Sequence, residues 1–255
     1  MPCAKAYEQI RDQTFSSVAG AGKVNAWFKR LALLDNGDWR PAAFWALRTQ
    51  SDDPAWLDKF LRKLERLAVS MFIRCEWTTD RISHYLEFLQ QLDSGLGLDS
   101  LAFELSPSER QDTLGALDGD VSGVKKTRKY VPLRLDEIRA KSAGAIYDHS
   151  VITVEHVLRQ NPGPESDWRS AFTDGQREPW THRLTNLVLL NQAKNSEAQN
   201  FEFQTKKSKY FGGKRGVTVF ALTNQVLQAQ DWDPAMLEAR QRELISTLPT
   251  EWELG

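Results

Sequence analysis

Cysteine is almost absent from this sequence, since Cys3 and Cys75 are its only two. Two cysteines cannot form a disulfide framework or a cysteine-based zinc site. Long apolar runs are missing as well: none approaches the length of a bilayer span, and the N-terminus has no signal-peptide core. We therefore expect a soluble, cytoplasmic protein that does not associate with a membrane.

The chain also lacks a strong net charge and is poor in histidine, with a formal charge of −1 and four histidines. This balance excludes a global electrostatic attraction to nucleic acid. Polyanion binding would therefore have to come from local clusters, and basic residues do concentrate at 125–141 and 206–215. Such clusters are equally consistent with an ordinary solvated surface. The chain has no repeat, and its 255 residues suffice for one large domain or two small ones.

The first hundred or so residues have the pattern of helices. Apolar residues recur at helical spacing after Pro54, with Asp52 or Asp53 as the N-cap, and again after Thr79 or Asp80. A Gly-, Ser- and Asp-rich stretch at 93–124 then marks the most plausible boundary, with one short helix between loops. We accordingly expect a helical domain over 1–120 and a second domain over 121–255.

The region 150–190 breaks the helical rhythm. It contains two β-type runs, VITVEHV and TNLVLL, joined by a long polar loop. A two-stranded ribbon needs a helix to pack against, and the helix-prone segment FEFQTKKSKYF follows it. The sequence thus predicts a mainly α protein with a small β ribbon, in which a ββα core spans about 150–212. Further C-terminal helices follow, one of them capped by Asp233 with Pro234 in its first turn.

Polar residues of this unit suggest a chemistry. Glu155 and His156 are adjacent in the first run, His182 and Asn186 precede or begin the second, and Asn195 follows it. Metal-assisted phosphodiester cleavage needs a cation to neutralise charge on the phosphate and a base to activate water. A carboxylate and an amide carbonyl are oxygen ligands suited to Mg²⁺. Imidazole, with a pKa near neutrality, is suited to accept the proton.

These residues resemble a known family. The sequence resembles the C-terminal nuclease domain of GmrSD-type modification-dependent restriction endonucleases. The resemblance lies in the pair Glu155-His156, the stretch from His182-Arg183 to Leu190, the pair Asn195-Ser196 and the later Asn200. That domain is a variant of the HNH, or ββα-metal, nuclease fold. Eight residues separate Asn186 from Asn195, which is the spacing of the second and third elements of an HNH motif.

The resemblance implies a role for each matching position. His156 would be the general base, and Glu155 and Asn195 would bind Mg²⁺ or Mn²⁺. Asn186 would tie the ribbon together and orient His156, and His182 would support the base or contact phosphate. It also implies lysines that contact the DNA backbone: Lys206, Lys207 and Lys209. We expect Arg159 and Arg183 to bind DNA phosphate as well.

Some positions have competing interpretations. Asn191 is a rival of Asn195 for the metal, although the spacing from Asn186 favours Asn195. His84 and His149 are interpreted as ordinary structural or surface residues. Because successive strand residues point to opposite faces, Glu155 and His156 are expected where the strand ends and bends into a loop.

The sequence departs from the family in two respects. Arg159 stands where the family often has proline, and no Walker-type glycine-rich loop represents the family's NTP-handling module. We therefore expect a C-terminal portion, or a stand-alone nuclease half, that works with an N-terminal or separate NTP-binding sensor.

The leading hypothesis is a metal-dependent DNA endonuclease of bacterial restriction and anti-phage defence, acting on DNA that is foreign or modified. The alternative is a DNA-binding or partner-docking module whose nuclease site is inactive or conditionally active. A third, weaker hypothesis is an RNA nuclease.

Overall fold

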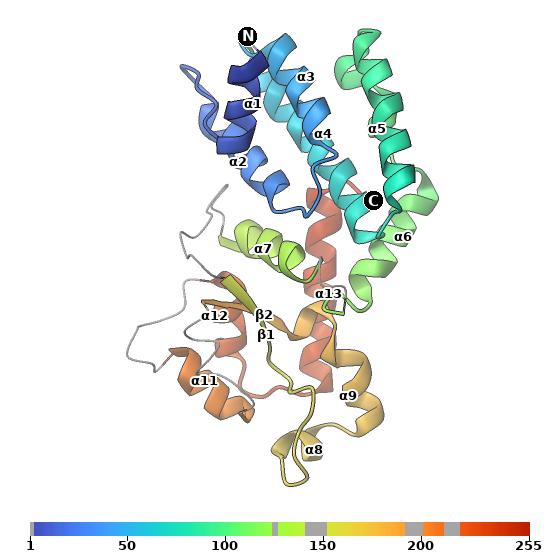
Figure 1. Ribbon diagram of the computed structural model, residues 1–255. Coiled ribbons are helices and arrows are strands. Elements are labelled where there is room, and N and C mark those ends of the chain that lie inside the picture. The colour runs from blue at the N-terminus through green and yellow to red at the C-terminus, as the bar shows by residue number, and fades with distance from the viewer. Residues whose placement is uncertain (1–2, 124–126, 141–151, 192–200, 212–219) are drawn as a thin grey trace. The chain divides into compact units, whose positions relative to one another are not determined.

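The computed structural model describes residues 3–123, 127–140, 152–191, 201–211 and 220–255, with side chains up to Ser208 in the fourth of these ranges (Figure 1). They form two compact units, one ending at Thr113 and one beginning at Leu114. The protein is mainly helical, and two strands pair into a small antiparallel sheet, as the sequence predicts. Each unit is described by itself.

The first unit is helical and has α4 at its centre. Its elements are α1 (Cys3–Asp12), α2 (Ala21–Ala32), α3 (Arg40–Gln50), α4 (Pro54–Ile73), α5 (Thr78–Asp93), the 3-10 turns η1 (Gly97–Asp99) and η2 (Leu101–Phe103), and most of α6 (Pro107–Asp118), within which the division falls. Helix α4 contacts α2, α3 and η2. Its Phe60 is fully buried and packs on Phe88 and Phe103.

Helix starts in both units follow the expected capping chemistry in two cases out of three. Asp53 accepts a hydrogen bond from the N–H of Trp56 at 2.9 Å, and Asp233 accepts one from Met236 at 2.8 Å. A proline follows each aspartate in the first turn. The predicted cap of α5 is wrong, because that helix begins at Thr78 and its N-cap residue is Trp77.

The second unit contains the sheet. Its elements are α7 (Thr127–Ala140), β1 (Ile152–His156), α8 (Asp167–Ala171), α9 (Asp174–Thr181), the 3-10 turn η3 (Leu184–Asn186), β2 (Leu187–Asn191), α11 (Phe203–Phe211), α12 (Ala221–Gln228) and α13 (Pro234–Glu251). Both α7 and α12 contact β2, and α13 contacts η3. The ribbon is therefore supported by helices, as a two-stranded sheet requires.

The register of the sheet explains its apolar pattern. Ile152 pairs with Asn191, and the pairing runs without interruption to His156 opposite Leu187. The four residues Leu187–Leu190 are all buried, because helices contact this strand in addition to β1. A strand of this kind has a continuous apolar run instead of an alternating one.

The connection between the strands differs from the prediction of a long polar loop. It contains α8 and α9, and α9 begins with a reciprocal capping box between Thr173 and Gln176. Trp168 of α8 is buried in the cluster that also contains Val157, Leu158, Phe203 and Trp232. Residues directly after β1 are thus anchored in the hydrophobic core of the second unit.

Candidate active site

The acid–imidazole pair lies at the end of a strand. Glu155 and His156 are the last two residues of β1, opposite Val188 and Leu187 of β2. The next N–H, that of Val157, donates to the carbonyl of Asn186 at 2.9 Å. The expected position of the pair at the strand end is confirmed. Its catalytic role stays a prediction.

Asn186 fixes the backbone that follows the pair. It is fully buried, and its Oδ1 accepts from the N–H of Leu158 at 2.6 Å. Its Nδ2 donates to the carbonyls of Leu158 and Thr181 at 3.1 and 2.9 Å. One amide therefore joins the end of β1, the end of α9 and the start of β2. It thereby fixes the backbone at Leu158, two residues after His156.

Replacing Asn186 by alanine should lower the free energy of unfolding by about 3 kcal/mol, since three buried backbone groups lose their partner at about 1–3 kcal/mol each before relaxation. Urea unfolding at pH 7 measures it. The exposed Gln228 of α12 offers a control, because its replacement by alanine should change stability by less than about 0.5 kcal/mol. Equal stability of Asn186→Ala and the control would contradict the bracing role.

A buried lysine contacts the acid of the pair. Lys206 of α11 is 2% exposed, and its Nζ donates to Oε1 of Glu155 at 2.8 Å and to the carbonyl of His156. Burial lowers the pKa of Lys206, and the attraction of Glu155 opposes this. The expectation that Lys206 contacts DNA phosphate needs correction, because a buried ammonium bound to a carboxylate is not presented to a ligand. Lys206 instead anchors α11 to the end of β1.

The imidazole of His156 is partly buried and has two polar neighbours. Its Nε2 lies 3.0 Å from Oγ of Ser122, and its Nδ1 lies 3.0 Å from Nε2 of the exposed Gln160. The Gln160 nitrogen is also 3.3 Å from Nε2 of the ring, so the amide lies across this edge and nearer to Nδ1.

The surroundings keep this imidazole neutral. Burial lowers the pKa of His156 to about 4, and the electrostatic interactions with His182, Lys206 and Arg128 add to the effect. Asp120 opposes it. A neutral imidazole at pH 7 has a lone pair, which is what a general base requires.

His182 and Ser122 complete the group around His156. His182 is the residue after α9, and its Nδ1 lies 2.6 Å from Oγ of Ser122. The two imidazoles are nearly perpendicular, with centroids 5.6 Å apart. Ser122 was missed by the sequence analysis, because it lies in the stretch 93–124 that was interpreted as a boundary. No motif marks it.

The low pKa of His156 predicts an acid-sensitive stability. In the unfolded chain His156 takes up a proton near pH 6.5, whereas in the folded chain it does so only near pH 4. The contribution of this group to the free energy of unfolding is therefore complete above pH 6.5 and is lost as the pH falls to 4. The loss from this group is about 3 kcal/mol. In EDTA, urea unfolding at pH 7 and pH 4 should show a smaller difference for His156→Asn than for the wild type. An identical difference in both would contradict the shift.

The donor chemistry of the site fits a hard divalent cation. Lys206 binds only Oε1 of Glu155, and within the described part of the chain Oε2 has no hydrogen-bond partner. Mg²⁺ needs few protein ligands and takes the rest from water and phosphate. Among the described residues, no group of three His, Cys, Asp or Glu side chains is arranged to hold a metal. Asn195, the predicted second ligand, lies outside the described residues, whereas Asn191, its rival for the metal, is the last residue of β2. His149 also lies outside the described residues.

Only some of the side chains that were predicted to contact DNA lie near Glu155 and His156. Arg159, three residues after His156, is near enough to lower the pKa of Lys206. The guanidinium of Arg183 lies 4.7 Å from the ring centroid of Trp180, next to His182.

The lysines of α11 have other positions. Lys207 donates to the carbonyl of Ala229 at 2.6 Å and lies over the ring of Phe203. Its ammonium therefore joins α11 to the residue that ends α12. The side chain of Lys209 is not among those described.

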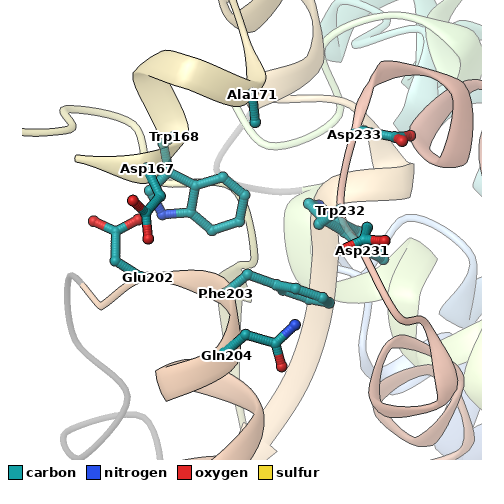
Figure 2. Close-up of a pocket in the computed structure, with 9 residues that line it drawn as sticks. All are labelled: Asp167, Trp168, Ala171, Glu202, Phe203, Gln204, Asp231, Trp232 and Asp233. Atoms are coloured by element: carbon teal, nitrogen blue, oxygen red, sulfur yellow. The ribbon is translucent and has the colours of Figure 1, made fainter.

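A separate hollow of about 370 Å³ lies in the second unit, and none of the predicted site residues lines it (Figure 2). Trp168, Phe203 and Trp232 form its apolar part, and Phe203 and Trp232 stack at 5.6 Å. The remaining lining residues are Asp167, Ala171, Glu202, Gln204, Asp231 and Asp233. Four carboxylates without a basic residue repel a phosphate backbone, so this hollow is not the DNA site.

One known protein family matches most of the second unit. Residues 113–247 match the family described as GmrSD restriction endonucleases, C-terminal domain. Searches of curated proteins and of solved structures return no match. Within the described residues, the helices are too short or too polar to cross a bilayer. The matched segment is more than half of the chain and contains the strand-end site, which we define as Glu155, His156, His182 and Asn186. The chain therefore belongs to the GmrSD restriction endonuclease family through its C-terminal domain.

Proposed function

We propose that the second unit is a metal-dependent DNA endonuclease of the HNH type. Membership of the family implies a restriction endonuclease acting on DNA. The observation that carries the proposal is the position of His156, which directly follows Glu155 at the end of β1 and has its ring 5.6 Å from that of His182. Phosphodiester hydrolysis needs an uncharged base that can accept a proton and an oxygen ligand for the metal.

The residues of the chain divide the work. His156 accepts a proton from the attacking water, and Asn186 holds the backbone after it in place. Lys206 fixes the carboxylate of Glu155 from inside the protein. A Mg²⁺ or Mn²⁺ ion held by Glu155 and Asn195 would supply charge neutralisation at the scissile phosphate.

Two arginines are proposed to bind the DNA backbone. Arg159 follows β1 and Arg183 follows His182. Guanidinium groups bind phosphate oxygens with two parallel hydrogen bonds, which positions DNA without reading its sequence. Recognition of a modified base is therefore assigned to another module.

We place this activity in bacterial defence, where it restricts foreign or modified DNA. It would work with an NTP-binding sensor, either on the same polypeptide or on a separate one. The basis is the family match, together with the lack of a Walker-type loop in the printed sequence.

Purified protein should nick supercoiled plasmid in Mg²⁺ or Mn²⁺ and should stop when EDTA is added. A labelled DNA duplex and an RNA of the same sequence, incubated side by side, separate a DNA nuclease from an RNA nuclease. Preferential cleavage of RNA, or cleavage that continues in EDTA, would contradict the proposal.

A second function, conditional DNA binding, has one observation in its favour. The amide of Gln160 lies against Nδ1 of His156, and Lys206 holds one oxygen of Glu155. Both groups occupy positions that water or a ligand would need, so activity would depend on a partner that moves them. Retention of DNA in a gel shift, without cleavage in Mg²⁺ or Mn²⁺, would favour this function.

A further inference from the structure

The hollow that the strand-end site does not use combines buried aromatic rings with carboxylates (Figure 2). Its rings belong to Trp168, Phe203 and Trp232, and at most 8% of each of these residues is exposed. Three of its four acidic residues are exposed and the fourth is half-buried, in the order Asp167, Asp231, Asp233 and Glu202. The hollow therefore has an apolar base and a negatively charged opening.

The carboxylates of the hollow are not neutralised by cations bound to them. Glu202 and Asp233 each accept a hydrogen bond from a neutral donor, Glu202 from Oγ of Ser166 at 2.6 Å. In the part of the chain that the structure describes, neither these two acids nor Asp167 and Asp231 form an ion pair. Negative charges gathered around one opening attract a cation from outside.

Two basic side chains lie over rings of the hollow, and both are bound elsewhere. Lys207 lies over Phe203, but its ammonium donates to the carbonyl of Ala229. Arg240 lies over Trp232 and donates to two backbone carbonyls. Neither side chain lines the hollow. These rings thus already have cations of the chain over them, as aromatic rings favour, while the carboxylates are left to a ligand.

Two buried polar atoms of the lining residues have no hydrogen-bond partner among the described residues. They are Nε1 of Trp232, a residue that is 3% exposed, and Oε2 of Glu202. Buried polar groups of proteins are normally hydrogen-bonded, and in a hollow a ligand can supply the bond. Nε1 is a donor and Oε2 an acceptor. A ligand that satisfies both must therefore carry an acceptor as well as a cationic donor.

We propose that the hollow is a docking pocket for an arginine or lysine side chain in a basic segment of a partner protein. Such a side chain lays its apolar stem along the rings and brings its charged group to the carboxylates. The backbone of the same segment supplies carbonyl acceptors for Nε1 of Trp232. A polyamine has the charge but no acceptor, and a nucleic acid would add negative charge to the carboxylates.

A peptide titration of the full chain measures the docking. The probe is a capped peptide of glycine and serine with one central arginine. The indole ¹H–¹⁵N signal of Trp232, assigned with Trp232→Phe, should shift on binding. The same peptide with citrulline in place of arginine has nearly the same shape without the charge and should bind at least about tenfold more weakly. Equal affinity for both peptides, or an arginine peptide that leaves the Trp232 signal unchanged, would overturn the proposal.

A double variant locates the binding at the carboxylates. Glu202→Gln/Asp231→Asn keeps the side-chain shapes, removes two charges and should weaken binding of the arginine peptide about tenfold. Glu8→Gln/Asp52→Asn, which changes two exposed acids of the first unit, is the matched control and should bind like the wild type. Unchanged affinity in the first variant would overturn the proposal.

Two further probes separate the docking pocket from other uses of the hollow. Spermidine tests a small polycation, and a short DNA duplex tests a nucleic acid. Both should move the Trp232 signal less than the arginine peptide does at the same concentration. A tighter complex with spermidine would assign the hollow to a small metabolite, and a larger shift with DNA would assign it to nucleic acid. Either result would overturn the docking proposal.

Discussion

Replacing Lys206 by methionine should destabilise the second unit by about 3–5 kcal/mol, the cost of removing one partner of a buried ion pair. Methionine has a similar length and fills the space, so the change is mainly electrostatic. The carboxylate of Glu155, with 17% of its side chain exposed, then loses its cation, and the carbonyl of His156 loses a donor. Chemical unfolding of the wild type and the variant at pH 7 measures the difference.

Two further variants test the explanation. If the unpaired carboxylate is the cause, Glu155→Gln/Lys206→Met should be more stable than the sum of the single changes predicts, because the double variant has no buried charge. Lys207→Met is the neighbouring control. It loses one hydrogen bond to Ala229 and should cost only about 1 kcal/mol. Equal effects of Lys206→Met and Lys207→Met would contradict the buried-pair account.

Replacing His156 by alanine should lower the rate of DNA cleavage by about 10²–10⁴-fold, which is the typical contribution of a general base. The physical reason is that His156 is the imidazole carried by the end of β1, directly after Glu155, and alanine leaves no group there to accept the proton of water. Single-turnover cleavage of a labelled duplex measures the chemical step. His84→Ala is the matched control, because His84 lies in the first unit and bonds to the carbonyl of Ala102. Equal losses in the two variants would point to a non-specific effect.

Features with a local cause were predictable from the sequence. The two apolar runs became β1 and β2, and the aspartates before Pro54 and Pro234 became caps, since a strand or a cap depends on a few neighbouring residues. The Glu155-His156 pair was located at the strand end by the alternation of strand side chains. The family resemblance predicted the match that now covers residues 113–247.

Features that depend on distant contacts were not predictable. Lys206 stands in a basic run and had the pattern of a surface residue, but its side chain is buried and its ammonium bonds to Glu155 and to the carbonyl of His156. Ser122 meets two histidines that lie 34 and 60 residues further along the chain, and one serine in a linker-like stretch carries no signal of this. The helices α8 and α9 are short enough that a polar loop describes their sequences equally well.

The most direct test of the central claim is plasmid nicking by the wild type and by His156→Ala, measured together in Mg²⁺. The wild type should convert supercoiled DNA to the open circle, and folded His156→Ala should leave it supercoiled over the same time. Conversion at the same rate by both proteins would contradict the assignment of the strand-end site as the catalytic centre.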